Sequence, residues 1–313
     1  MESTVSIVIP TIASAARAPL LWRALDSVLR DQGARVIPIV VANGQRFSPP
    51  ALDALKSRSD IRFFYREEGS AVGARLAGRE AVDTEFFAML DDDDEFLPGA
   101  VAARLASFKN DPAVDVVVTN GFRRHGQLEV IDFPNFAAFP RDPLWHLMSY
   151  SWLQPAAGLY RSATIHPGYF AEVPRSMEWT YLAARLALER RLRFVDTPTY
   201  RMHRETAESL SASRHYQQGE PEAIRRMMAL EVPARIRKRL KKKYAASLHF
   251  LAELARQDGE ARTAWGYHLR SLAAPYGLRY LSYTRHLLRP TGKKKASGMA
   301  GGISPPARGR LSA

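Results

Sequence analysis

Four short, mostly apolar segments recur at regular intervals along the first 90 residues of the chain. They are residues 5–10, 36–41, 61–65 and 86–90. Segments of this length and composition are typical of strands that are buried on both faces of a sheet. Amphipathic helices are predicted between them, at residues 20–30, 49–56 and 71–81. The alternation of strand and helix predicts an α/β fold, in which helices cover both faces of a sheet with parallel strands.

The pattern is less regular after residue 98. The elements predicted there are a helix at 99–109, a strand at 114–119, an irregular aromatic stretch at 128–139, a strand at a sheet edge at 159–161 and a helix at 177–190. Residues 194–196 then lead into residues 199–203, to which no element is assigned. Two or more helices rich in Leu and Arg follow between residues 221 and 289. Together these segments predict a mixed, Rossmann-like sheet flanked by helices, with a helical extension at its C-terminal side.

Positive charge is concentrated in this extension. Residues 221–313 contain 20 Lys and Arg against 5 Asp and Glu, a net charge of +15, whereas the whole chain carries +13. We therefore divide the chain into an α/β domain at 1–215, with halves at 1–98 and 99–215, and a basic helical extension at 216–290. The remaining residues, 291–313, are rich in Gly, Ser, Pro and basic residues, and we predict that they are disordered.

The composition excludes several classes of site and of location. The chain has no cysteine, so it can form neither a disulfide nor a thiolate metal site. Its first residues lack the basic and apolar regions of a signal peptide, and no run approaches the ~18 apolar residues of a membrane span. We expect a cytoplasmic protein, either free or peripheral on the inner face of the membrane.

The most basic segment, residues 236–244, allows three interpretations. It can be a solvated face of a helix, or a surface that binds an anionic membrane through the extension at 221–295. Nucleic acid is the least favoured partner, because no recognition motif or row of stacking aromatic residues accompanies the basic residues. The first two interpretations remain open from the sequence.

An acidic run follows directly on the fourth predicted strand. Leu90 is followed by Asp91, Asp92, Asp93, Asp94 and Glu95. Carboxylates this close repel one another unless a positive charge lies among them, and Mg²⁺ or Mn²⁺ takes carboxylate oxygens while keeping positions open for phosphates. A solvated acidic turn is the simpler alternative. The preceding strand favours a binding site, because α/β sheets bind ligands at the carboxyl ends of their strands.

Several motifs, in this order and spacing, resemble those of the family 2 glycosyltransferases, inverting enzymes of the GT-A fold that use nucleotide-sugars. The resemblance covers about residues 4–210. The matching segments are residues 5–11 (VSIVIPT), 20–32 (LLWRALDSVLRDQ), 73–75 (GAR), 90–95 (LDDDDE, the DxD motif), 158–162 (GLYRS), 168–170 (GYF), 176–179 (SMEW) and 200–203 (YRMH).

The resemblance implies roles for the matched residues. Residues 1–98 would bind the donor and 99–215 the acceptor. The nucleotide-sugar is expected to contact Pro10, Thr11, Asn43, Arg75, Asp91, Asp92 and Arg201. The ion, Mn²⁺ or Mg²⁺, is expected to be held by Asp93, Asp91 and His203. Glu178 is the expected catalytic base, and Trp179 is the expected acceptor-binding residue.

The chemistry of inversion is consistent with these roles. A carboxylate must lie on the face of the sugar opposite the leaving group and take the proton from the attacking hydroxyl. Glu178 begins a predicted helix, whose dipole favours an ionised acid, although acids are common there without any catalytic role. Trp179 can stack on a sugar or pack in the core. Side chains alternate along an extended segment, so Asp92 and Asp94 could instead support the site electrostatically.

The chain departs from the family pattern at three positions. Asn43 stands where the family has an aspartate that helps to hold the nucleoside, and Met177 stands before Glu178 where a second acid is common. Leu76 follows Arg75 where an asparagine is usual. We predict transfer of a sugar, from a UDP-sugar in the first instance, to a hydroxyl of a glycan or a lipid-linked acceptor. The alternatives are a catalytically degenerate relative that binds nucleotide-sugars or glycans and, less favoured, a nucleotidyltransferase, because residues 10–17 lack the glycines of its phosphate loop.

Overall fold

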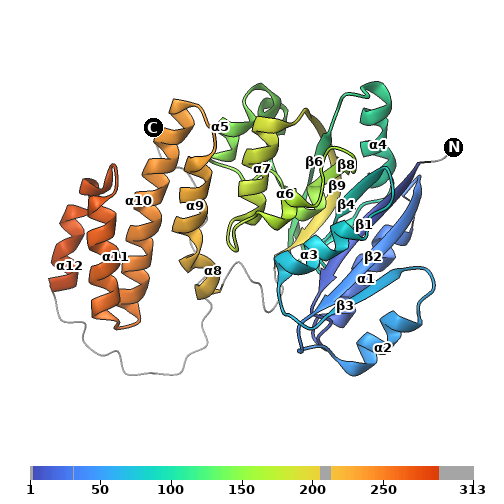
Figure 1. The fold of residues 1–313 in the computed structure, drawn as a ribbon, viewed down its shortest axis with the longest axis horizontal. Helices are drawn as coiled ribbons and strands as arrows, with labels where there is room; N and C mark the ends of the chain where they lie inside the picture. Colours follow the sequence, from blue (N-terminus) through green and yellow to red (C-terminus); the bar gives the residue numbers. More distant parts are fainter. Residues whose placement is uncertain (1–2, 31, 205–212, 289–313) are drawn as a thin grey trace.

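The computed structural model describes residues 3–30, 32–204 and 213–288. Within these residues a nine-stranded sheet has the strand order β3-β2-β1-β4-β8-β6-β9-β5, and β7 pairs with β6. Figure 1 shows the sheet with its helices on one side of the molecule and the C-terminal helices, coloured orange to red, on the other. The mixed sheet flanked by helices that the sequence predicts is confirmed.

The first half of the sheet is parallel. Its strands are β1 (Thr4–Thr11), β2 (Arg35–Asn43), β3 (Arg62–Arg66) and β4 (Phe86–Met89), and the helices between them are α1 (Ala18–Leu29), α2 (Pro49–Ser57) and α3 (Ala71–Glu80). Each bound lies within two residues of the predicted one. Because β1 lies between β2 and β4, the carboxyl ends of these three strands meet at one edge of the sheet.

The second half of the sheet is mixed. Strand β8 (Gly158–Arg161) lies antiparallel between β4 and β6 (Val116–His125), so the segment that we predicted at a sheet edge is central. The stretch predicted to be irregular begins with β7 (Leu128–Ile131), which pairs with β6, and ends with the 3₁₀ helix η1 (Phe136–Arg141). Strand β9 (Leu192–His203) runs parallel to β6 and antiparallel to the two-residue β5 (Glu95–Phe96).

The helices of this half are α4 (Ala100–Asn110), α5 (Pro143–Leu147), α6 (Gly168–Ala171) and α7 (Glu178–Glu189), with a 3₁₀ turn η2 (Pro155–Ala157). Helix α7 matters most for the site, because its first turn faces the carboxyl end of β4. Glu178 in this turn pairs with Arg75 of α3, and α3 approaches β1 closely at Gly78. A Cβ atom at Gly78 would lie 2.2 Å from Cγ1 of Val8, so only glycine allows this approach.

The C-terminal helices are α8 (Arg214–Gln218), α9 (Glu220–Ala229), α10 (Ala234–Gln257), α11 (Ala261–Ala273), the 3₁₀ helix η4 (Gly277–Tyr283) and α12 (Thr284–Leu288). Ile224, Met227, Ile236 and Leu240 of α9 and α10 are at most 2% exposed and belong to the same apolar core as the sheet. The packing is therefore continuous across the domain boundary that we placed at residue 215.

No helix in the described ranges is both long and apolar enough to cross a membrane. The tail that we predicted to be disordered, residues 291–313, lies outside the described residues.

Candidate active site

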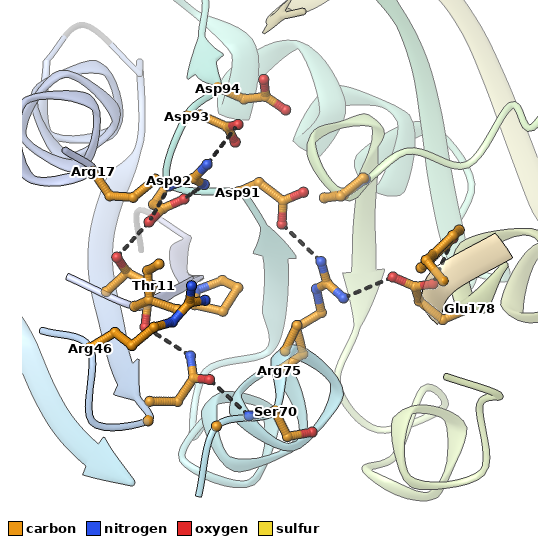
Figure 2. Close-up of a pocket in the computed structure, with 18 of the residues that line it drawn as sticks. Thr11, Arg17, Arg46, Ser70, Arg75, Asp91, Asp92, Asp93, Asp94 and Glu178 are labelled. Carbon is orange, nitrogen blue, oxygen red and sulfur yellow. Dashed lines mark hydrogen bonds and ion pairs between the residues drawn. The ribbon is translucent and has the colours of Figure 1, made fainter. Parts of the chain in front are cut away.

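A cavity of about 690 Å³ opens at the carboxyl ends of β1, β2 and β4. Figure 2 shows its wall, with the acidic run on one side and Glu178 facing it across Arg75. The structure brings ten of the eleven predicted site residues to this cavity, namely Pro10, Thr11, Asn43, Arg75, Asp91, Asp92, Asp93, Glu178, Trp179 and His203. The fold thus gathers residues from six separate segments of the chain at one edge of the sheet.

Three acids of the run are close enough to share a cation. Asp91, Asp93 and Asp94 each offer a carboxylate oxygen, and these oxygens lie within 4.8 Å of one another. Burial and the repulsion of Asp93 and Asp91 raise the pKa of Asp94 well above its usual range, since no positive charge offsets them fully. A set of carboxylate oxygens is the ligand type that Mg²⁺ and Mn²⁺ prefer, so the residues present fit such an ion.

His203 was expected among the metal ligands, and the structure places it differently. Its ring lines the cavity, but Nε2 lies 2.6 Å from Oε1 of Glu95, and its backbone N–H donates to Asp94 at 3.0 Å. Burial lowers the pKa of His203 despite the neighbouring Glu95. Among the described residues the third acid of the cluster is Asp94, so this geometry favours Asp94 over His203 as a ligand.

Asp92 points away from this cluster, toward β1. Its carboxylate accepts a hydrogen bond of 2.5 Å from the Thr11 hydroxyl and forms an ion pair with Arg17, which also reaches Asp93 at 3.3 Å. Burial raises the pKa of Asp92 to about 6, although Arg17 and Thr11 stabilise its ionised form. The predicted alternation is not seen, because residues 91–94 form a turn in which the N–H of Asp94 donates to the carbonyl of Asp91 at 3.1 Å, and Asp94 joins Asp91 and Asp93 in the cluster while Asp92 faces Thr11 (Figure 2).

Arg75 joins the two sides of the cavity. Its guanidinium lies 3.1 Å from Oδ1 of Asp91 and 3.2 Å from Oε1 of Glu178, and the residue is 8% exposed. The guanidinium also lies over the ring of Trp179, 5.3 Å from its centroid. Trp179 therefore packs against Arg75 and also lines the cavity. A single buried cation therefore fixes the expected base relative to the first acid of the run.

Asn43 holds the backbone at the donor end of the cavity. Its Nδ2 donates to the carbonyl of Thr11 at 2.8 Å, and its Oδ1 accepts the N–H of Ser70 at 2.9 Å. Ser70 in turn caps α3, since its hydroxyl accepts the N–H of Gly73. An amide has both a donor and an acceptor, so it can tie β1 to the start of α3, whereas an aspartate could make only the second bond.

Arg201 is the predicted site residue that does not line the cavity. Strand β5 pairs with β9 so that Glu95 stands directly opposite Arg201, and the guanidinium lies between Glu95 and Glu129. Cross-strand neighbours on one face of a sheet interact, which explains why the side chain turns away from the donor end. Arg201 therefore lies outside the lining of this cavity, and its contact with the donor stays a prediction.

Sequence reasoning missed several residues that line the cavity. Two of them are engaged with the predicted residues: Arg17 with Asp92 and Asp93, and Tyr216 with Glu178. A signal existed for Arg17, because it is a lone cation just after the first strand. Tyr216 has no sequence signal of this kind, since it lies 38 residues from its partner.

Comparisons with known proteins agree with this architecture. Residues 6–147 match the sequence model of Glycosyl transferase family 2. The chain is structurally similar to residues 1–349 of S. aureus TarS crystallised in complex with UDP-GlcNAc, with a TM-score of 0.59, 14% identity, and coverage of 91% of this chain and 88% of that one. The same TarS fragment in complex with UDP matches with a TM-score of 0.52, 14% identity and coverage of 90% and 92%.

No curated protein matches the chain. At this level of identity the similarity to TarS establishes the fold, and the match over residues 6–147 assigns the family to the part of the chain that holds the acidic run. The family predicted from the motifs is therefore confirmed over residues 6–147, which form a family 2 glycosyltransferase domain, and the chain has the GT-A fold.

Proposed function

We propose that the protein is an inverting glycosyltransferase that transfers a sugar from a UDP-sugar to a hydroxyl of a glycan or a lipid-linked acceptor. The observation that carries the proposal is the position of Glu178, whose carboxylate faces the acidic run across the cavity and is tied to Asp91 through Arg75. One wall of the cavity thus holds acids suited to the diphosphate side of a donor. The opposite wall holds one acid suited to the acceptor side.

The donor end is supported by the residues at the carboxyl ends of β1 and β2. Thr11 and Asn43 border it, and Arg17 supplies positive charge beside the acids. UDP is the nucleotide that we favour, because TarS, which has the same fold, was crystallised with UDP-GlcNAc and with UDP. Asn43 retains one N–H and one lone pair beyond its two internal bonds, so it can still contact the uracil ring.

A divalent cation, Mn²⁺ or Mg²⁺, would be held by Asp91, Asp93 and Asp94. When bound, it supplies Lewis-acid stabilisation for the charge that develops on the departing diphosphate. Arg17 and Arg75 would keep Asp92 and Asp91 ionised and correctly oriented, because each guanidinium pairs directly with one of these carboxylates.

Glu178 would act as the general base. As the acceptor oxygen bonds to the anomeric carbon from the side opposite the diphosphate, its proton passes to the carboxylate of Glu178, and the bond from carbon to the diphosphate breaks. Trp179 follows Glu178 in the first turn of α7 and offers an apolar surface at the same side of the cavity. Its position supports a contact with the acceptor sugar.

The proposed lipid-linked acceptor requires that the enzyme work at a membrane surface. Residues 261–288 contain four Arg and no Asp or Glu, and Leu269, Leu278, Leu281 and Leu288 in this range are each more than half exposed. A surface of exposed leucines among arginines suits the interface of an anionic bilayer, where each basic residue contributes ~1 kcal/mol. We propose that this surface, with the lysines of α10, places the enzyme peripherally at a membrane that carries the acceptor.

The test of the proposed reaction is Glu178→Gln, which keeps the shape of the side chain and removes its basicity. Loss of general-base catalysis should lower kcat by ~10²- to 10⁴-fold, with little change in binding of a UDP-sugar measured by calorimetry. Glu80→Gln, at the exposed end of α3, is the matched control and should leave kcat unchanged. Retention of full kcat by Glu178→Gln, or a loss confined to donor binding, would contradict the base assignment.

A further inference from the structure

A tyrosine from the C-terminal extension reaches the expected catalytic base. Tyr216 lies in α8, and its side chain lines the cavity next to the first turn of α7. Its hydroxyl donates to Oε2 of Glu178 at 3.0 Å and accepts the backbone N–H of Met177 at 2.8 Å. Residue 216 lies well beyond the region that matches the family model.

Glu178 is consequently held at both carboxylate oxygens. Arg75 approaches Oε1 and Tyr216 approaches Oε2, so rotation of the carboxylate would break one bond or the other. A base must present its lone pair within hydrogen-bond reach of the attacking hydroxyl, and small displacements of a reacting group cost large factors in rate. Burial, and the negative charge of Glu178, raise the pKa of Tyr216 well above its usual range, so the hydroxyl remains a donor at neutral pH.

The same tyrosine stabilises an unusual backbone conformation just before Glu178. Met177 has a φ of 54°, one of three positive φ values at non-glycine residues in the described part of the chain. Such a conformation costs energy and persists where the surroundings hold it. Besides the bond from Met177, the Ser176 hydroxyl donates to the carbonyl of Tyr216 at 2.6 Å. At Gly219 a Cβ atom would lie 2.1 Å from Oγ of Ser176, so the two segments are in close contact.

We propose that Tyr216 is a positioning residue for transfer, which fixes the carboxylate of Glu178 and the start of α7 through its hydroxyl. The C-terminal extension then completes the active site, in addition to any role at a membrane. This inference rests on the proposed role of Glu178 as the base. It assigns to α8 a function that neither the matched motifs nor the acidic run contains.

The test is a double-mutant cycle of Tyr216→Phe and Glu178→Gln, with kcat and KM measured for transfer to a soluble acceptor. Tyr216→Phe removes only the hydroxyl, and we expect kcat to fall by ~10- to 100-fold, the range for loss of a hydrogen bond to a charged group, with KM for the donor unchanged. In the Glu178→Gln background the same change should have almost no effect, because the two residues act through one another. Tyr283→Phe is the matched control: its hydroxyl also bonds a carboxylate, that of Glu253, within the extension but away from the cavity.

Each outcome decides between explanations. Equal losses in both backgrounds would mean that the hydroxyl merely supports the fold, and a rise in donor KM alone would place Tyr216 in the donor site. Either result would overturn the inference, as would an unchanged kcat in Tyr216→Phe. If Glu178→Gln itself leaves kcat unchanged, the proposed base fails instead. Should Tyr216→Phe not fold, Ser176→Ala removes only the bond to the Tyr216 carbonyl and should lower kcat in the same manner to a smaller extent.

Discussion

Replacing Arg75 with methionine tests whether one buried cation balances both sides of the cavity. The variant keeps most of the side-chain volume and removes the charge between Asp91 and Glu178. Removing one partner of a buried ion pair costs ~3–5 kcal/mol, and the lower figure applies here because the Asp91 side chain is 30% exposed. Unfolding entropy scales with length, at about 0.66 kcal/mol/K for a chain of this size, so Tm should fall by ~4–5 °C.

The matched control is Arg185→Met. Arg185 also bridges two acids, Glu172 and Glu189, but these side chains are 65% and 40% exposed. Surface ion pairs contribute less than ~1 kcal/mol, so the control should shift Tm by no more than ~1.5 °C. Thermal unfolding followed by circular dichroism measures both variants under the same conditions.

Manganese provides the second part of this test. In Arg75→Met the carboxylate of Asp91 lacks its guanidinium partner, so repulsion within the acidic cluster grows and a bound cation relieves more of it. Added Mn²⁺ should therefore raise the Tm of the variant more than that of the wild type. The difference in Tm between the two proteins should become smaller. The reasoning is refuted if Arg75→Met melts like the Arg185 control, or if Mn²⁺ shifts wild type and variant equally.

Two further predictions concern the ion and the membrane. Asp93→Asn should abolish most transfer and weaken UDP-sugar binding only when Mn²⁺ or Mg²⁺ is present, measured by calorimetry with and without EDTA; full wild-type activity in EDTA would disprove the metal assignment. Replacing Leu278 and Leu281 with serine should reduce co-sedimentation with anionic vesicles, while Leu128→Ser, an equally exposed leucine on β7, should not. Binding should fall as salt shortens the Debye length from ~10 Å at 0.1 M, and equal binding to neutral vesicles would exclude the electrostatic contribution.

The sequence predicted well those features that depend on neighbours along the chain. Strand β4 and the acidic run are contiguous, so their adjacency in space follows from the sequence, and a parallel sheet brings the ends of β1 and β2 to the same edge. The order of the strands in the sheet was harder to predict, because it depends on pairing between segments that are distant in the sequence. Strand β8 comes after β6 in the chain yet lies between β4 and β6 in the sheet. A strand of only four residues does not indicate in its sequence which strands it will pair with.

Side-chain partners were predicted least well for the same reason. The match of residues 200–203 to a family motif placed Arg201 and His203 together at the donor, and both in fact face Glu95. Their direction is set by β5, a strand of two residues whose pairing with β9 has no periodicity to reveal it. Tyr216 shows the opposite error, because a residue without any motif contacts the expected base.

The C-terminal extension also contributes to the stability of the domain that contains the sheet. Ile224, Met227, Ile236 and Leu240 are almost fully buried in the core that carries the sheet. Burying each such side chain contributes ~1.5–3 kcal/mol, so the four together contribute about 6–12 kcal/mol, which is comparable with the net stability of a typical domain. The domain boundary that we placed at residue 215 reflects a change in charge composition along the sequence. Burial of α9 and α10, together with the hydrogen bond of Tyr216 to Glu178, indicates that the sheet, the start of α7 and these helices pack as one unit.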